Sequence, residues 1–239
     1  MDNEFGKVVV LGGSSGIGLA AVRRLAAAGH EVIATGRDAD KLEAVRASTE
    51  GLLRVDAFDG AQREQLDRFF ASVGIIDHLV IALSGGDGAG PFKDLDLASL
   101  RRGFEAKFWP HVQAAQAVLP VLRTGGSITF VTAISARIAN PGTSGLAAIN
   151  AAIEAMVPVL ARELAPTRVN AVSPGVVKTP WWNSVPDEAR QAFFERHASE
   201  LPVGRVGQPD DVAHAIAFLI GNGYTTGSVI ECDGGLHLV

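Results

Sequence analysis

The sequence predicts an α/β protein in which seven strands form one doubly wound parallel sheet with helices on both faces. Two observations lead to this fold class. Short apolar runs alternate with longer amphipathic stretches along the chain, which is the order of repeated strand–helix units. Some of the runs, such as Val8–Val10, are continuously apolar, as expected for strands of a parallel sheet that are covered on both faces.

Each strand is predicted where a run of apolar and β-branched residues is bounded by Gly, Pro or polar residues. The runs lie at Lys7–Leu11, Glu31–Thr35, Leu52–Arg54, His78–Ala82, Ser127–Thr132, Arg168–Val172 and Val229–Cys232. Helices are predicted in the stretches between them, at Ile17–Ala28, Asp40–Ser48, Ala61–Val73, Leu100–Leu122, Ser144–Leu164 and Asp210–Ile220. Pro110 and Pro158 fall inside two of these helices, where each removes one backbone hydrogen bond and favours a kink.

Length and composition favour a single domain over residues 1–239. The chain is 47% hydrophobic and 20% charged, which is enough for a substantial core, and no linker or repeat divides it. The alternation of strands and helices is interrupted once, after Pro180. We expect a lid-like insertion at about 181–202, which begins with Trp181 and Trp182. These two rings favour either an apolar or planar ligand or a simple packing role.

Charge, hydropathy and cysteine content exclude several functional classes. The net charge of −5 argues against a nucleic-acid partner. No unbroken apolar run reaches the roughly 18 residues of a membrane span, so no membrane association is expected. The single cysteine, Cys232, excludes an internal disulfide framework and fits a reducing cytoplasm. We therefore expect a cytoplasmic protein with a small-molecule substrate and no metal site.

A glycine-rich turn follows the first predicted strand. Gly12, Gly16 and Gly18 have the spacing Gly-x-x-x-Gly-x-Gly and stand between a strand and a helix. Glycines at such a turn let the backbone approach a pyrophosphate, whose charge lies at the N-terminus of the following helix. The motif alone is weak evidence, but its place between strand and helix favours dinucleotide binding. The predicted sheet is therefore of the Rossmann type.

Three further segments extend this pattern. Asp56–Ala57 follows the third strand, residues 168–175 read Arg-Val-Asn-Ala-Val-Ser-Pro-Gly and continue to Thr179-Pro180, and residues 226–235 read Thr-Gly-Ser-Val-Ile-Glu-Cys-Asp-Gly-Gly. With these segments, the chain resembles the short-chain dehydrogenase/reductase family over almost its full length. The resemblance implies a nicotinamide dinucleotide cofactor. The cofactor-binding residues that it implies are Gly12, Ser14, Ser15, Gly16, Ile17, Gly18, Arg37, Asp56, Ala57, Ala82, Ser84, Gly85, Thr132, Asn150, Pro174, Gly175, Val177 and Thr179.

The end of the second strand bears on the choice of cofactor. A ribose 2′-hydroxyl is normally bound by a carboxylate at this place, but here Gly36 is followed by Arg37. A guanidinium forms charge-assisted hydrogen bonds with a 2′-phosphate, which an acid would repel. The sequence therefore favours NADP(H) over NAD(H). The alternative is that Arg37 is a solvated loop charge.

The family's four catalytic positions hold other residues in this chain. The resemblance places Leu146 at the proton-donating tyrosine and Asn150 at the lysine that lowers the tyrosine pKa and holds the nicotinamide ribose. It places Ala133, with Thr132 beside it, at the serine that orients the substrate. It places Lys107 at the asparagine that supports a water relay.

The family's usual proton donor is therefore absent, because the only tyrosine, Tyr224, stands just before the last strand. In the family, the positions of Lys107 and Asn150 face each other across neighbouring helices. We hypothesise that the Lys107 ammonium has exchanged sides and donates the proton, with its pKa lowered by partial burial. Alternatively, Lys107 lies on the helix surface and pairs with Glu154 or water. The candidate catalytic residues are Lys107, Thr132 and Asn150.

Three functions are compatible with these features. The first is an NADP(H)-dependent oxidoreductase with altered proton delivery that acts on a small carbonyl, enone or imine, because hydride transfer depends mainly on cofactor orientation and electrostatics. The second is an NADP(H)-binding pseudoenzyme that acts as a redox sensor or partner subunit, and the third is a non-redox reaction in the same pocket. We also expect a homotetramer or homodimer, because the helices at 100–122 and 144–164 resemble those of the family's four-helix interface.

Overall fold

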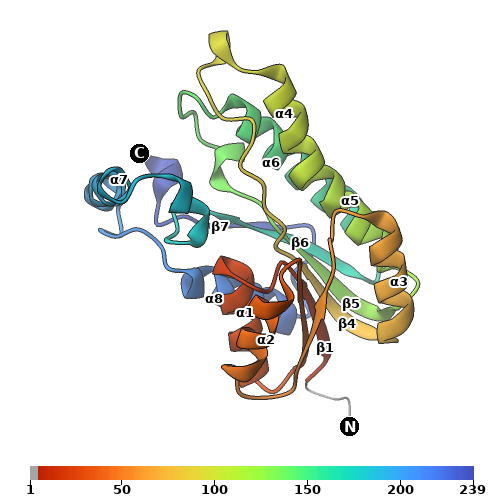
Figure 1. Ribbon diagram of the computed structural model, residues 1–239. Coiled ribbons are helices and arrows are strands. Elements are labelled where there is room, and N and C mark those ends of the chain that lie inside the picture. Colours follow the sequence, from red (N-terminus) through yellow and green to blue (C-terminus); the bar gives the residue numbers. More distant parts are fainter. Residues whose placement is uncertain (1–4) are drawn as a thin grey trace.

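The computed structural model describes residues 5–239 and contains a seven-stranded parallel sheet with helices on both faces (Figure 1). The strand order is β3-β2-β1-β4-β5-β6-β7, and every neighbouring pair is parallel. The strands are β1 (Lys7–Leu11), β2 (Glu31–Gly36), β3 (Leu53–Ala57), β4 (Ile76–Ile81), β5 (Leu122–Val131), β6 (Arg168–Pro174) and β7 (Val229–Cys232). The predicted doubly wound fold is confirmed.

The helices cover the sheet in two layers, each with its own hydrophobic core. The helices are α1 (Gly16–Ala27), α2 (Ala39–Ala47), α3 (Arg63–Val73), α4 (Leu97–Gly103), α5 (Trp109–Ala117), α6 (Ser144–Glu163), α7 (Asp187–Glu200) and α8 (Pro209–Gly221). Val9 and Leu11 of β1 point toward α3, α5 and α6, whereas Val8 and Val10 point toward α1, α2 and α8. This alternation follows from the two-residue period of a strand.

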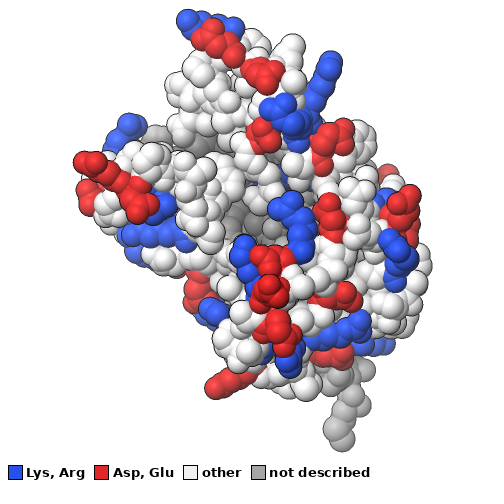
Figure 2. Space-filling view, viewed as in Figure 1, with Lys and Arg blue, Asp and Glu red and all other residues white. Residues whose placement is uncertain are grey.

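The strand order reverses beside β1, which pairs with β2 on one side and with β4 on the other. The connection after β1 leads to α1 on one face of the sheet, whereas the connection after β4 leads to α5 on the other face. Ligands of doubly wound sheets bind in the crevice at the carboxyl ends of such strands. The space-filling view is hollowed in its centre, between the regions of α1 and α6 in Figure 1, and blue side chains border the hollow (Figure 2). The fold thus directs the search for a site to this edge.

The helix predicted at Leu100–Leu122 is wrong in its extent and continuity. The chain forms α4, then a π-helical turn η2 (Phe104–Phe108), then α5, and Leu122 already begins β5. Pro110 lies in the first turn of α5 and cannot donate a backbone hydrogen bond; the wider turn just before it accommodates this gap. Pro158, by contrast, lies within α6, which continues as one helix.

The segment predicted as an insertion at 181–202 contains regular structure. It begins in the short helix η4 (Pro180–Ser184) and continues into α7. Phe194 and Leu201 pack with Val206 and Leu236 in a third hydrophobic cluster, against which Trp182 also lies. A lid role for this segment stays a prediction.

One helix within residues 5–239, α6, is long and apolar enough to cross a membrane by length and composition alone. Its Ile153 and Val157 are fully buried in the core against the sheet. In all, 33% of its most apolar window is buried, and one such helix is weak evidence for a membrane span.

Candidate active site

The glycine-rich turn between β1 and α1 is packed too closely for side chains. Gly12 has φ +83°, and a Cβ there would stand 2.6 Å from the carbonyl oxygen of Ala82. A Cβ on Gly18 would overlap the carbonyl oxygen of Gly12. Gly16, with φ +52°, begins α1. The turn therefore brings bare backbone to the edge of the crevice, as close approach to a pyrophosphate requires.

The N-terminus of α1 fits an anionic group. Ser15 precedes the helix, but its side chain makes no capping hydrogen bond, and no acidic residue lies in the first turn. The first backbone N–H groups of α1, from Gly16 to Gly18, lack a partner within their own helix and point out of its end. Thr179, on the segment after β6, stands over this turn, since its Cβ lies 3.5 Å from a Cβ built on Gly16. A cofactor pyrophosphate would be held here by N–H groups and the helix dipole.

The end of β2 has no side chain at Gly36, directly before the cationic residue Arg37. A Cβ on Gly36 would stand 2.8 Å from Ser14 Oγ, so a carboxylate side chain at this position would require Ser14 to move. Arg37 is exposed and makes no ion pair with any residue in the described part of the chain. Asp56 lies opposite Thr35 in the neighbouring strand, and Asp56 accepts a hydrogen bond from Arg54 at 3.3 Å. Ser14 and Arg37 could thus bind an anionic group, which a carboxylate at the end of β2 would repel.

The loops after β4 and β6 complete the border of the crevice. Ala82 donates a backbone hydrogen bond to Leu11, which fixes the start of the loop that contains Ser84 and Gly85. Trp181 Nε1 donates to the Gly85 carbonyl oxygen at 3.3 Å, so η4 reaches across to this loop.

The loop after β6 is anchored from the other side. Gly175 directly follows Pro174 and packs against Asp233. A Cβ built on Gly175 would stand 2.7 Å from the Cα of Asp233. The buried Val177 pairs with Gly207 in an isolated bridge. The segment from Pro174 to Thr179 thus turns back toward the glycine-rich turn, as the resemblance implies for a nicotinamide-binding loop.

Lys107 points inward from η2 rather than into solvent. Its Nζ donates a hydrogen bond to the carbonyl oxygen of Thr132 at 3.2 Å, at the carboxyl end of β5. Burial lowers the pKa of the Lys107 ammonium from 10.5 to about 8, and the carboxylate of Glu154 opposes this lowering. An ammonium with such a pKa exchanges protons readily near neutral pH.

Glu154 lies at the centre of a buried polar cluster that the sequence did not reveal as a site. Its Oε1 accepts hydrogen bonds from Thr132 Oγ1 at 2.7 Å and Ser173 Oγ at 2.8 Å, and its Oε2 accepts from Arg137 Nε at 3.0 Å. The one available signal was a carboxylate placed four residues after Asn150 in an otherwise apolar helix. In sequence, Glu154 was considered only as a surface partner of Lys107.

Asn150 is buried one helical turn before Glu154. Its Nδ2 donates to Ser135 Oγ at 3.1 Å and to the Leu146 carbonyl oxygen at 2.9 Å, whereas its buried Oδ1 has no partner. Within residues 5–239, no hydrogen bond joins Asn150 to Lys107. The orphaned oxygen is suited to accept a hydrogen bond from a bound ligand, such as a ribose hydroxyl.

The family's tyrosine and serine positions carry no side chain that can donate a proton. Leu146 and Ala133 are half-buried apolar residues, and Tyr224 is fully exposed in the loop after α8. His111 is fully buried, and its Nδ1 donates to the Lys107 carbonyl oxygen at 2.7 Å. Burial and the Lys107 charge lower the His111 pKa to about 3, so this ring stays neutral and supports the backbone of η2.

Comparison with known proteins identifies the family. The family described as enoyl-(acyl carrier protein) reductase matches residues 12–237. The chain is 33% identical to the 3-oxoacyl-[acyl-carrier-protein] reductase FabG of Thermotoga maritima, over 97% of this chain and 98% of that protein. A solved small-chain dehydrogenase in complex with NADPH is 36% identical with a TM-score of 0.85, over 98% of this chain and 100% of that one.

A second solved structure is also similar to this chain. An NADPH-bound short-chain oxidoreductase from Pseudomonas aeruginosa PAO1, described as containing an atypical catalytic center, is 29% identical with a TM-score of 0.88. The alignment covers 97% of this chain and 96% of that one. By sequence and fold, the chain belongs to the short-chain dehydrogenase/reductase family of NAD(P)-dependent oxidoreductases.

Proposed function

We propose that this protein is an NADP(H)-dependent oxidoreductase in which Lys107, rather than a tyrosine, delivers the proton to the substrate. One observation carries the proposal. The Lys107 ammonium lies inside the fold at the carboxyl end of β5, and its pKa is lowered to about 8 by burial. The only tyrosine of the chain, Tyr224, is fully exposed. Lys107 is therefore the group best suited to proton transfer near neutral pH.

The preference for NADP(H) is supported by the end of β2. Gly36 provides no carboxylate that would repel a 2′-phosphate, and Arg37 is exposed without an ion pair in the described residues. A guanidinium in this position would form two charge-assisted hydrogen bonds with a 2′-phosphate. An NADPH-bound relative with 36% identity also supports this cofactor.

The chemistry divides between the cofactor and the chain. When bound, the reduced nicotinamide supplies a hydride to the electrophilic carbon of the substrate. Lys107 gives one proton to the substrate oxygen, and its neutral amine then takes a proton back from solvent. Asn150, whose buried Oδ1 has no partner among the described residues, would hold the nicotinamide ribose. An imine that is already protonated, or an enone, demands less of the proton donor than a ketone does.

The substrate is a small carbonyl, enone or imine in this proposal. The Thermotoga maritima relative is named for reducing a 3-oxoacyl group, which is a ketone. Trp181 and Trp182 provide an apolar wall beside the crevice, and Trp181 is hydrogen-bonded to Gly85 on its far side. We propose that residues 181–202 form a lid within one domain of 1–239, because this segment bridges the two loops that border the site.

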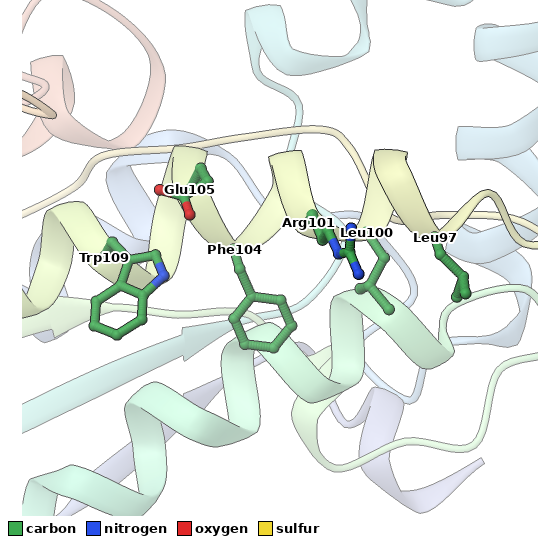
Figure 3. Close-up of a pocket in the computed structure, with 6 residues that line it drawn as sticks. All are labelled: Leu97, Leu100, Arg101, Phe104, Glu105 and Trp109. Atoms are coloured by element: carbon green, nitrogen blue, oxygen red, sulfur yellow. The ribbon is translucent and has the colours of Figure 1, made fainter.

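We also propose that the protein forms a homodimer or homotetramer through α4, η2 and α5. Leu97 and Trp109 are 68% and 46% exposed and border a hollow of about 370 Å³. Figure 3 shows Leu100, Phe104 and Trp109 projecting from the same side of this helical run. Arg101 and Glu105 lie four residues apart beside the hollow. In a two-fold contact with a second copy, opposite charges on this face would meet.

Purified protein tests the proposed function directly. Binding of NADPH and NADH is measured by fluorescence, and NADPH oxidation is followed by absorbance with ketone, enone and imine substrates. We expect tighter binding of NADPH than of NADH, and oxidation with at least one substrate class. If NADPH binds but no class gives turnover above background, a cofactor-binding pseudoenzyme that acts as a redox sensor or partner subunit replaces the proposal.

A further inference from the structure

Glu154 is a charged residue in the middle of an apolar helix face. On α6 it follows Ile153, which is fully buried in the core, and its own side chain is 8% exposed. A carboxylate in such a place loses most of its hydration, which costs several kcal/mol unless other groups compensate it. An apolar residue would fill the same position at no such cost. Packing alone therefore does not explain a glutamate at this position.

The compensation of this carboxylate comes from three separate elements. Thr132 at the end of β5 and Ser173 in β6 donate to one oxygen, and Arg137, after the short helix at 134–136, donates to the other. Arg137 also pairs with Glu231 of β7 at 3.0 Å. The carboxylate thus joins α6 to the ends of three neighbouring strands, at the edge of the sheet that borders the crevice.

Thr132 connects this cluster to Lys107. The Thr132 side chain donates to Glu154, whereas its backbone carbonyl oxygen accepts from Lys107 Nζ. The charged and titratable groups that face Lys107 are Glu154 from α6 and His111 from α5, with Arg137 behind Glu154. His111 is neutral, so Glu154 is the one negative charge in the described residues known to act on the ammonium.

We propose that Glu154 is the positioning residue of the proton-donor centre: its carboxylate fixes Thr132, to which Lys107 is hydrogen-bonded, and supplies the counter-charge for the Lys107 ammonium. The inference rests on the proposed role of Lys107 for its catalytic consequence, but not for its effect on Lys107 itself. Arg137 has the opposite influence, because its positive charge partly neutralises Glu154. The two residues therefore set the proton affinity of Lys107 in opposite directions.

The test measures the titration of Lys107 without any substrate. The chain has five lysines, Lys7, Lys41, Lys93, Lys107 and Lys178, so lysine labelled with ¹³C at Cε gives a simple NMR spectrum in which Lys107→Met identifies one signal. The Lys107 midpoint is expected near pH 8 in the wild type. Loss of an opposite charge from a buried site shifts a midpoint by about one pH unit or more, so Glu154→Gln should lower it by that amount.

Three further variants test the sign of the shift, its background and its rescue. Arg137→Gln should raise the Lys107 midpoint, because Glu154 then acts with less neutralisation. Glu163→Gln removes an exposed carboxylate from the same helix and should leave the midpoint unchanged. Glu154→Asp should restore part of the wild-type midpoint. Arg137 is 39% exposed, so its replacement tests the idea even if Glu154→Gln fails to fold.

The outcomes separate this inference from the proposed function. An unchanged Lys107 midpoint in folded Glu154→Gln, or a lowered one in Arg137→Gln, overturns the inference. With an active substrate, the alkaline fall in kcat should move to lower pH in Glu154→Gln together with the NMR midpoint. If the midpoint moves but Lys107→Met keeps full turnover, the proposed function fails while the role of Glu154 toward Lys107 stands.

Discussion

Replacing Lys107 with methionine should make the protein more stable at neutral pH. Methionine keeps much of the aliphatic stem and removes a charge whose burial is unfavourable. A pKa of about 8 in the folded chain, against 10.5 for free lysine, corresponds to roughly 3 kcal/mol of unfolding free energy lost to the buried ammonium. Loss of the hydrogen bond to Thr132 offsets about 1 kcal/mol, and the half-buried side chain reduces the effect further. We expect a net gain of about 1–2 kcal/mol.

The pH dependence of this gain has a definite sign. Below pH 8 the lysine is protonated in both the folded and the unfolded chain, so the whole cost of burial is present. Between pH 8 and 10.5 the folded chain loses its proton first, so the cost disappears and the wild type approaches the variant. Above this range neither state carries the charge. The advantage of Lys107→Met is therefore largest at neutral pH and small above pH 10.5.

Urea unfolding followed by tryptophan fluorescence measures this difference at pH 7 and pH 10. Lys93→Met is the matched control, because Lys93 is 84% exposed and its replacement should change the unfolding free energy little at either pH. A Lys107→Met variant that is less stable than the wild type at pH 7, or whose difference is the same at both pH values, would refute the argument. It would show that the ammonium is not desolvated.

Three further predictions concern the cofactor and the assembly. Arg37→Ala should weaken NADPH binding by about 1.5–3 kcal/mol in a fluorescence titration and leave NADH binding almost unchanged; equal losses for both cofactors would remove Arg37 from the 2′-phosphate site. Gly18→Ala should abolish binding of both cofactors, because its Cβ overlaps the Gly12 carbonyl oxygen and forces the turn open; calorimetry with normal affinity would contradict this. Trp109→Glu should shift the mass in light scattering toward the monomer, whereas a wild-type protein that is already monomeric at micromolar concentration excludes the proposed interface.

The sheet and the glycine-rich turn after β1 could be predicted because their signals are local. Continuous apolar runs mark β1 and its neighbours, and the glycine spacing at 12–18 requires nothing beyond a strand, a turn and a helix. The family resemblance then supplied the loops after β4 and β6. The helix at 100–122 was predicted as one element because its apolar residues continue through the π-helical turn, which leaves no trace in a simple period.

The polar centre could be predicted only in part. Lys107 was identified from its place in the family pattern, but its partner Thr132 lies 25 residues away in sequence. The partners of Glu154 are 17, 19 and 22 residues away, on three different elements, so no spacing along α6 identifies them. The helix α7 was missed because Asp187–Glu200 is polar on most sides, with Phe194 and His197 as its buried residues. Tertiary contacts, not local pattern, stabilise that helix.

The dependence of turnover on Lys107 and on pH tests the central claim most directly. With the best substrate of the panel, kcat is measured from pH 6 to pH 10 in the wild type and in Lys107→Met, together with the Kd of NADPH. The account predicts that wild-type kcat falls above about pH 8 and that the variant loses about 10²–10⁴-fold in kcat with an unchanged Kd. Full turnover in Lys107→Met, with the same pH profile as the wild type, would contradict the account.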